Sequence, residues 1–210
     1  MASSLGRRFG IPRRRPSDPL DELIQTVLSQ NTSDLNSTRA FRSLKTAFPS
    51  WDAAARARPS ALAAAIRVGG LARLKSARIH SILREVARRE GGYRLRRLRH
   101  APAEEALRAL EGLPGVGPKT RACVLLFACR KPAFPVDTHV HRIVGRLGLV
   151  PAEASAARAQ ALLEPHVPGA RALDLHLNLI RLGRELCRPR APRCGSCPLR
   201  GRCSHARRAS

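Results

Sequence analysis

The sequence predicts an all-α protein, on three observations. Apolar residues recur at helical spacing in most segments, which is the pattern of amphipathic helices. Proline and glycine separate these segments at short intervals, so the helices are expected to be short. One segment alternates as a strand would, but no partner strand is evident elsewhere in the 210 residues, and an unpartnered strand leaves its backbone groups without hydrogen bonds.

The first clear helix is predicted from Leu20 to Leu28, where apolar residues follow the i, i+3, i+4, i+7, i+8 pattern. Asp18 suits the N-cap position and Pro19 suits the first helical position. An alanine-rich segment, 52–66, favours helix through propensity alone. The helical spacing then returns in a further run: Ile79, Ile82, Leu83 and Val86.

A glycine-rich hairpin occupies residues 113–119, with the sequence Leu-Pro-Gly-Val-Gly-Pro-Lys. Gly115 and Gly117 allow a tight turn that leads into an apolar helix. With Gly117 as N-cap, Lys119 falls in the first helical turn, where unpaired N–H groups bind anions. The positive end of the helix disfavours a second positive charge and favours the neutral amine. Lys119 is therefore either a phosphate contact or a nucleophile.

The second half of the chain continues the helical pattern. Cys123 and Cys129 lie in the apolar run after the hairpin, where small buried side chains are their expected role. Asp137 precedes an amphipathic run over 140–147 and is a candidate N-cap for it. Segment 152–163 is alanine-rich. The alternating leucines also form two helical stripes, which predicts a helix buried on two faces: Leu173, Leu175, Leu177 and Leu179.

The charge balance indicates a polyanionic partner. Lys and Arg exceed Asp and Glu by 39 − 15 = 24, and basic residues gather in 67–99 and 181–210. An architectural or ribosomal protein that coats nucleic acid would show the same excess. The aromatic content of 3% counts against a module that stacks bases of a single strand. No apolar stretch is long enough to span a membrane, so a cytoplasmic, nucleoid-associated protein is expected.

Four cysteines crowd into the last part of the chain with gaps of six, two and five residues: Cys187, Cys194, Cys197 and Cys203. Disulfides are not expected in an intracellular protein, so the grouped thiols indicate a metal site. Four thiolates suit either tetrahedral zinc or an iron–sulfur cluster, and the spacing alone slightly favours zinc. The loops between them are rich in arginine and proline, so a metal would hold cations in place for a phosphate backbone.

Taken together, these features resemble the endonuclease III family of DNA glycosylases, within the helix–hairpin–helix superfamily. The resemblance extends in order and spacing over roughly residues 17 to 205. The matching motifs are Leu28-Ser-Gln-Asn-Thr-Ser-Asp34, Gly70-Leu71 with Lys75-Ser76-Ala77, Leu113-Pro-Gly-Val-Gly-Pro-Lys-Thr120, Val136-Asp-Thr-His-Val140 with Arg142, and the four spaced cysteines.

The resemblance implies two helical domains that flank a DNA-binding cleft. Residues 17–131 would form a six-helix barrel with the hairpin, and residues 132–210 with 1–16 a domain whose cysteines hold a structural 4Fe-4S cluster. The partner would be double-stranded DNA with damaged bases or abasic sites, bound by a monomer, with the damaged nucleotide flipped into the cleft.

The resemblance also implies roles for single residues. Lys119 would be the nucleophile and Asp137 the acidic partner of a bifunctional glycosylase and AP lyase, which removes oxidised pyrimidines and nicks abasic sites by Schiff-base β-elimination. Gly115, Gly117 and His139 would contact the DNA backbone. Gln30, Asn31 and Leu71 are candidate wedges for the gap left by the flipped base. Arg142 is expected to brace the fold or a phosphate, and His141 to be structural.

The chain departs from the family pattern in ways that bear on lesion preference. Asn31 stands where the family has glutamine, although Gln30 is adjacent, and Ala72 and Arg73 replace a polar and aromatic pair. The N-terminus is about ten residues shorter, so the usual first helix is expected to be largely missing. Two rival functions stay open: a monofunctional mismatch or uracil glycosylase, and a non-catalytic, cluster-containing protein that binds duplex DNA.

Overall fold

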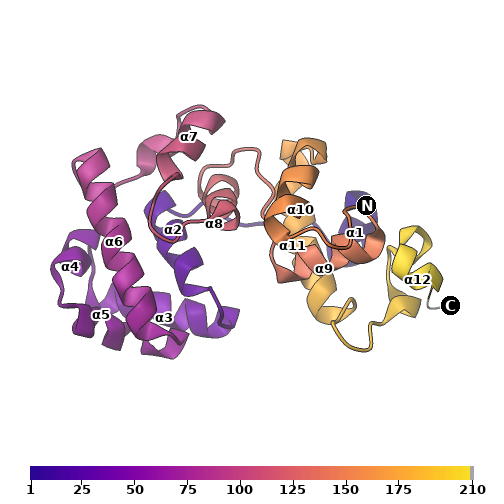
Figure 1. Ribbon diagram of the computed structural model, residues 1–210, viewed down its shortest axis with the longest axis horizontal. Coiled ribbons are helices and arrows are strands. Elements are labelled where there is room, and N and C mark those ends of the chain that lie inside the picture. The colour runs from indigo at the N-terminus through magenta and orange to yellow at the C-terminus, as the bar shows by residue number, and fades with distance from the viewer. Residues whose placement is uncertain (209–210) are drawn as a thin grey trace. The chain divides into compact units, whose positions relative to one another are not determined.

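The computed structural model describes residues 1–208, and every regular element in that range is a helix, which confirms the predicted all-α class (Figure 1). This part of the chain divides into two compact units, one of residues 16–130 and one of residues 1–15 with 131–208. None of the described helices is both long enough and apolar enough to cross a membrane.

The unit of residues 16–130 is built from short helices joined by tight turns. A 3-10 turn (Arg67–Gly69) precedes the long helix, and a π-helical turn (Val124–Ala128) continues the last one. The α-helices are α2 (Pro19–Leu28), α3 (Asp34–Ala47), α4 (Trp51–Arg56), α5 (Pro59–Ala65), α6 (Ala72–Glu90), α7 (Ala103–Leu110) and α8 (Pro118–Cys123). A second 3-10 turn, Arg96–Arg99, lies between α6 and α7.

The apolar stripes predicted for α2 and α6 form the core of this unit. Leu20, Leu23 and Ile24 on α2 are fully buried, as are Ile79 and Ile82 on α6. The predicted cap of α2 is confirmed, because the Asp18 side chain accepts a hydrogen bond from the Leu20 N–H at 3.0 Å and Pro19 is the first helical residue. The 52–66 segment forms two helices rather than one, because Pro59 begins α5.

The second unit contains α1 (Ala2–Phe9), α9 (Thr138–Leu147), α10 (Ala156–Leu163), α11 (Gly169–Glu185) and α12 (Ser204–Arg208). Three 3-10 turns, Glu164–His166, Cys194–Ser196 and Arg200–Arg202, complete it. α10 begins later than the alanine-rich segment does, since the Ser155 hydroxyl caps it by accepting from the Arg158 N–H at 3.2 Å.

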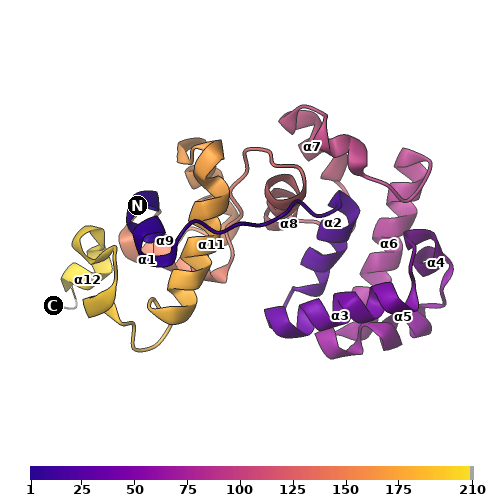
Figure 2. The ribbon, with the colours of Figure 1, turned by 180° about the vertical axis from the view of Figure 1, so that it is seen from behind.

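The N-terminus corrects one expectation. A first helix is present as α1, and it lies against α11 (Figure 2). Its Leu5 is fully buried, and α11 reaches back to the end of α1: Asn178 donates to the Gly10 carbonyl at 3.0 Å and Arg181 to the Phe9 carbonyl at 3.1 Å. These tertiary contacts stabilise a helix that is too short to persist alone.

The alternating leucines lie on a helix, as predicted, because residues 169–185 form α11. Leu175 and Leu179 are buried, and so are the polar residues His176 and Asn178 on other sides of the helix. His176 Nδ1 is 2.9 Å from the Pro135 carbonyl oxygen. The expected burial of both leucine stripes is met only in part, because Leu173 and Leu177 of the second stripe are half-buried.

Candidate functional site

The hairpin has the geometry of an anion site. Gly115 adopts a left-handed conformation with φ of 70°, and Gly117 is the N-cap of α8, followed by Pro118 at the first helical position. Within residues 1–208 the N–H groups of Gly115 and Gly117 donate no hydrogen bond. Unpaired N–H groups at a helix start are suited to bind a phosphate oxygen.

Lys119 lies in the first turn of α8 and is partly exposed. Among the residues that the structure describes, its amine has neither a hydrogen-bond acceptor nor an ion-pair partner. Thr120 and Cys123, which follow it on α8, are buried and anchor the helix. The amine is therefore held on a fixed helix beside the anion-binding turn, where no protein carboxylate competes for it.

Arg78 of α6 connects this hairpin to the loop after α2. Its Nη1 donates a hydrogen bond to Gln30 Oε1. Its side chain also lies over Gly115, because a Cβ built on that glycine would be 2.5 Å from Arg78 Cδ and 2.8 Å from Cζ. The positive φ of Gly115 favours glycine, and the absence of a side chain there leaves room for Arg78.

Lys75, one turn earlier on α6, holds two further backbone segments together. It is only 2% exposed, and its Nζ donates to the Leu28 carbonyl at 2.7 Å and to the Gly69 carbonyl at 2.8 Å. Burial lowers the pKa of this lysine. The end of α2 and the turn before Leu71 are therefore fixed relative to each other by one buried side chain.

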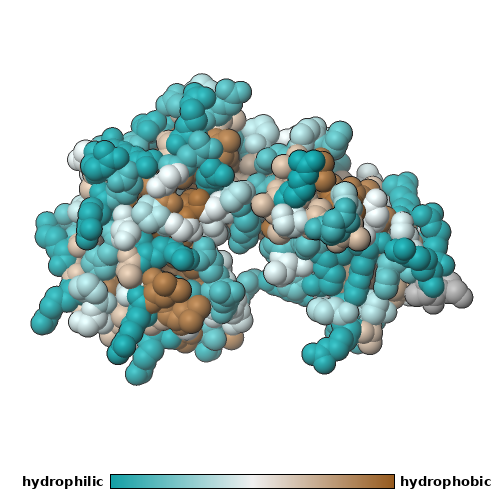
Figure 3. All heavy atoms as spheres, viewed as in Figure 1, coloured by the Kyte–Doolittle hydropathy of each residue, from teal (hydrophilic) through white to brown (hydrophobic). Residues whose placement is uncertain are grey.

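The wedge candidates Asn31 and Leu71 share an unusual conformation. Both are exposed and both adopt a positive φ, 52° and 50°. Leu71 is 52% exposed and Leu74 is 56% exposed, and a hydrophobic patch lies over α6 in this unit (Figure 3). A strained, solvent-exposed leucine contributes nothing to the core, and such strain is typical of functional positions.

Asp137 belongs to the other unit, where it is the N-cap of α9. Its Oδ1 accepts a hydrogen bond from the Val140 N–H at 2.7 Å, so its predicted capping role is confirmed. The residue is partly exposed. A capping carboxylate is rigid, and its second oxygen is available to a ligand.

His139 and Arg142 form a polar group where α9 meets α11. Arg142 Nη2 is 3.1 Å from His139 Nδ1 and donates to the Gly183 carbonyl at 3.0 Å. Arg142 Nε donates to the Cys187 carbonyl, also at 3.0 Å. Arg142 therefore braces the fold, as expected. His141 Nε2 is 2.7 Å from the Ala154 carbonyl oxygen, which agrees with a structural role.

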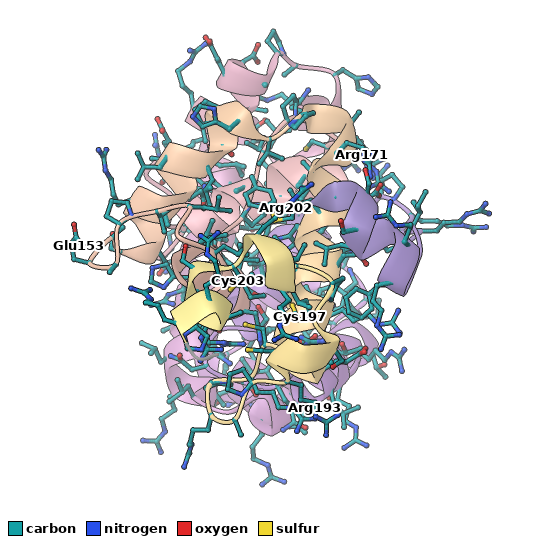
Figure 4. All side chains as sticks on the ribbon, turned by 90° about the vertical axis from the view of Figure 1, so that its right-hand side faces the viewer. Glu153, Arg171, Arg193, Cys197, Arg202 and Cys203 are labelled. Carbon is teal, nitrogen blue, oxygen red and sulfur yellow. The ribbon has the colours of Figure 1, made fainter. Side chains whose placement is uncertain are left out.

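The four C-terminal cysteines are free thiols that line one small cavity of about 20 Å³. Figure 4 shows two of them, Cys197 and Cys203, on the C-terminal segment near Arg202. No group of three His, Cys, Asp or Glu side chains among residues 1–208 is placed to hold a single metal ion. Burial, and to a lesser extent the three neighbouring thiols, raise the pKa of Cys197.

Arg146 of α9 fixes the first part of this cysteine loop. Its Nη1 donates to Cys187 Sγ at 3.3 Å and to the Arg188 carbonyl at 2.7 Å, and its Nη2 donates to the Pro189 carbonyl at 2.8 Å. The cavity thus combines an all-thiol donor set with a cation that hydrogen-bonds one sulfur, which fits an anionic iron–sulfur group. Cys123 and Cys129 are buried and lie apart in the other unit.

Sequence reasoning gave no role to Arg78, Lys75 or Arg146. A signal for two of them exists in the sequence. Lys75 precedes Ile79 by four residues and Arg78 precedes Ile82 by four, so both lie on the buried stripe of α6. Basic residues on an apolar helical face need internal partners.

Comparison with known proteins gives consistent matches. The model of the HhH-GPD superfamily of base excision DNA repair proteins matches residues 24–168. Endonuclease III of Thermotoga maritima is 35% identical over 99% of this chain and 92% of its own length. A provisionally named DNA glycosylase of Arabidopsis thaliana is 41% identical over 79% of this chain, but over only 56% of that protein.

A solved structure described as a trapped endonuclease III–DNA covalent intermediate, with an estranged adenine, has a TM-score of 0.85. It is 26% identical in sequence, and the match covers 99% of this chain and 94% of that one.

Proposed function

This chain belongs to the endonuclease III family within the HhH-GPD superfamily of base excision DNA repair proteins, and we propose that it is a bifunctional DNA glycosylase and AP lyase. The observation that carries the lyase proposal is Lys119, an unpaired amine at the helix start of the hairpin. A solved relative is described as a covalent intermediate with DNA, which supports a nucleophilic mechanism.

In this mechanism the amine nitrogen of Lys119 attacks C1′ of the damaged nucleotide, and the bond between C1′ and the base breaks with the electron pair leaving on the base. The base takes up a proton as it departs. The sugar ring then opens at C1′, its oxygen is protonated, and an iminium links Lys119 to C1′. Removal of a C2′ proton expels the 3′ phosphate by β-elimination, and water then restores the amine.

Asp137 supplies a carboxylate for these steps. As the base departs, positive charge develops on the sugar, and a fixed carboxylate stabilises it. The same group can accept the proton that the attacking amine must lose. The hydrogen bond from the Val140 N–H holds one oxygen in place at the start of α9.

Damaged duplex DNA is the substrate that the charge and the surface features support. The net charge is +24, and the hairpin offers unpaired N–H groups to the phosphate backbone. The exposed residues Leu71 and Asn31, both with a positive φ, would fill the gap left by a flipped nucleotide, and Gln30 precedes Asn31 in the chain. Oxidised pyrimidines are the proposed lesions, on the family resemblance.

We assign the cavity of the four cysteines to a 4Fe-4S cluster rather than to zinc. Cys187, Cys194, Cys197 and Cys203 would hold it, since they line one cavity as an all-thiol donor set and the family resemblance implies this cluster. When bound, the cluster would supply structural order to the arginine-rich loop. Iron and sulfide analysis of purified protein tests the assignment, and one zinc per chain would contradict it.

The two rival functions are separated by two assays. Sodium borohydride reduces a Schiff base, so the wild type incubated with an abasic duplex should form a covalent adduct that the Lys119→Ala variant lacks. A monofunctional glycosylase would release a base without forming the adduct. A non-catalytic DNA-binding protein would bind the duplex and do neither. A panel with thymine glycol, dihydrouracil, uracil and abasic sites then identifies the substrate.

A further inference from the structure

Arg78 occupies the junction of two loops that the proposed function assigns to DNA. From α6 it donates to Gln30 Oε1 in the loop after α2, and its side chain crosses over Gly115 of the hairpin. Gly115 has no side chain that could occupy this space. One arginine therefore joins the hairpin to the loop that carries Gln30 and Asn31, within a single compact unit.

The charge of Arg78 is not neutralised by a neighbouring acid. Among the residues that the structure describes, its partner is an amide oxygen and not a carboxylate. Other arginines of the unit pair with acids, as Arg89 does with Glu85 and Arg97 with Glu90. A neutral acceptor binds a guanidinium more weakly than a carboxylate does. The hydrogen bond to Gln30 alone therefore does little to explain why this half-buried cation lies here.

The contact fixes the orientation of the Gln30 amide. A guanidinium only donates hydrogen bonds, so the oxygen of the amide must face Arg78 and the NH₂ group must face away. Gln30 is partly exposed, and its Nε2 has no acceptor within residues 1–208. Gln30 therefore presents its NH₂ group to a ligand, as a hydrogen-bond donor. Asn31 has no comparable anchor in this part of the chain.

We propose that Arg78 is a positioning residue, an inference that rests on the proposed function. It orients Gln30 so that Gln30 recognises the base opposite a flipped nucleotide. Held by Arg78, Gln30 donates from Nε2 to an acceptor on the unpaired base. The preference of this protein for the opposite base then depends on Arg78, although Arg78 itself touches no base.

The test measures binding of full-length protein to duplexes that carry a tetrahydrofuran abasic analogue opposite each of the four bases. Salt is held constant, because phosphate contacts make affinity salt-dependent. The variants are Arg78→Met, Gln30→Ala, Gln30→Glu and the double variant Arg78→Met/Gln30→Ala. Gln30→Glu keeps an acceptor for Arg78 and replaces the donor with oxygen. Arg84→Met is the control, since it removes one exposed arginine from the same helix.

The wild type should bind the four duplexes with dissociation constants that differ by about three- to tenfold, the range expected of one hydrogen bond. Arg78→Met, Gln30→Ala and Gln30→Glu should each remove that difference, and the double variant should lose no more than the single ones. Arg84→Met should weaken binding to all four duplexes equally and keep the difference. Thermal unfolding of each variant checks that the fold is retained.

Three results would overturn the proposal: equal wild-type affinity for all four duplexes, an unchanged preference in Arg78→Met, or losses in the double variant equal to the product of the single losses. The binding readout needs no turnover. A wild type that discriminates among the duplexes but yields neither released base nor borohydride adduct would therefore sink the proposed enzymatic function and leave the role of Arg78 standing.

Discussion

Two substitutions of Asp137 separate its structural role from its proposed chemical role. Asp137 Oδ1 accepts the Val140 N–H at 2.7 Å and caps α9. Asparagine caps a helix about as well as aspartate does, so Asp137→Asn should keep the cap and remove only the charge. Asp137→Ala removes both. The two variants should therefore differ in stability, whereas both should lose turnover to the same extent.

The expected change in stability follows from the single hydrogen bond between the Val140 N–H and Asp137. Loss of an N-cap side chain costs about 1 kcal/mol, which for a chain of this size lowers the melting temperature by roughly 2–4 °C. Asp137→Asn should melt within about 1 °C of the wild type, on the same scale. Without the carboxylate, base release in a single turnover should slow by at least about 100-fold in both variants.

The assays are thermal unfolding by circular dichroism, single-turnover base release, and binding to an abasic-analogue duplex. Binding should change by less than about threefold, because the proposed role of the carboxylate lies in the transition state. The reasoning fails if Asp137→Asn excises the lesion at the wild-type rate. It fails equally if Asp137→Asn is destabilised as much as Asp137→Ala, since the cap would then depend on charge.

Three further perturbations test other parts of the structure. Lys75→Met leaves the Leu28 and Gly69 carbonyls without their buried donor, and urea unfolding should show a loss of about 2–5 kcal/mol. Burial lowers the pKa of Lys75 in the folded protein below its ordinary 10.5. Between the folded-state pKa and 10.5 the unfolded state therefore binds more protons than the folded state. The free energy of unfolding of the wild type should rise with pH in that window. Lys75→Met should remove that slope, and an unchanged slope would contradict the account. Cys197→Ser removes one of four thiols around the cavity, so iron content should fall by more than about half, whereas the same change at buried Cys123 should preserve it. Leu71→Ala should weaken excision from duplex DNA by about tenfold while altering the melting temperature by less than about 1 °C, because the side chain is 52% exposed; a large drop in melting temperature would show that Leu71 belongs to the core.

The helices and caps could largely be predicted from the sequence, since local signals determine them. Asp18 with Pro19, and Asp137 before an apolar stripe, specify helix starts through short-range hydrogen bonds that the structure contains. The helix α1 could not be predicted in this way, because its stability depends on Asn178 and Arg181, which are more than 160 residues away in the chain.

The residues of the candidate site that belong to sequence motifs could be predicted. The residues whose roles depend on tertiary contacts could not. The hairpin and the cysteine spacing point to Lys119 and to a metal site from the sequence alone. The roles of Arg78 and Lys75 depend on which loops α6 packs against. No local pattern predicts that Arg78 donates a hydrogen bond to Gln30, which lies 48 residues earlier in the chain. The left-handed conformation of Leu71 also depends on the surrounding fold, since leucine rarely adopts a positive φ, whereas asparagine tolerates one.

The central claim is that Lys119 forms a covalent bond with DNA during the reaction. The most direct measurement is borohydride trapping on an abasic duplex, followed by protease digestion and mass spectrometry of the cross-linked peptide. We expect an adduct on Lys119 in the wild type and in the control variant Lys45→Ala. We expect no adduct in Lys119→Ala, which should still bind the duplex. A cross-link on another residue, or undiminished trapping in Lys119→Ala, would contradict it.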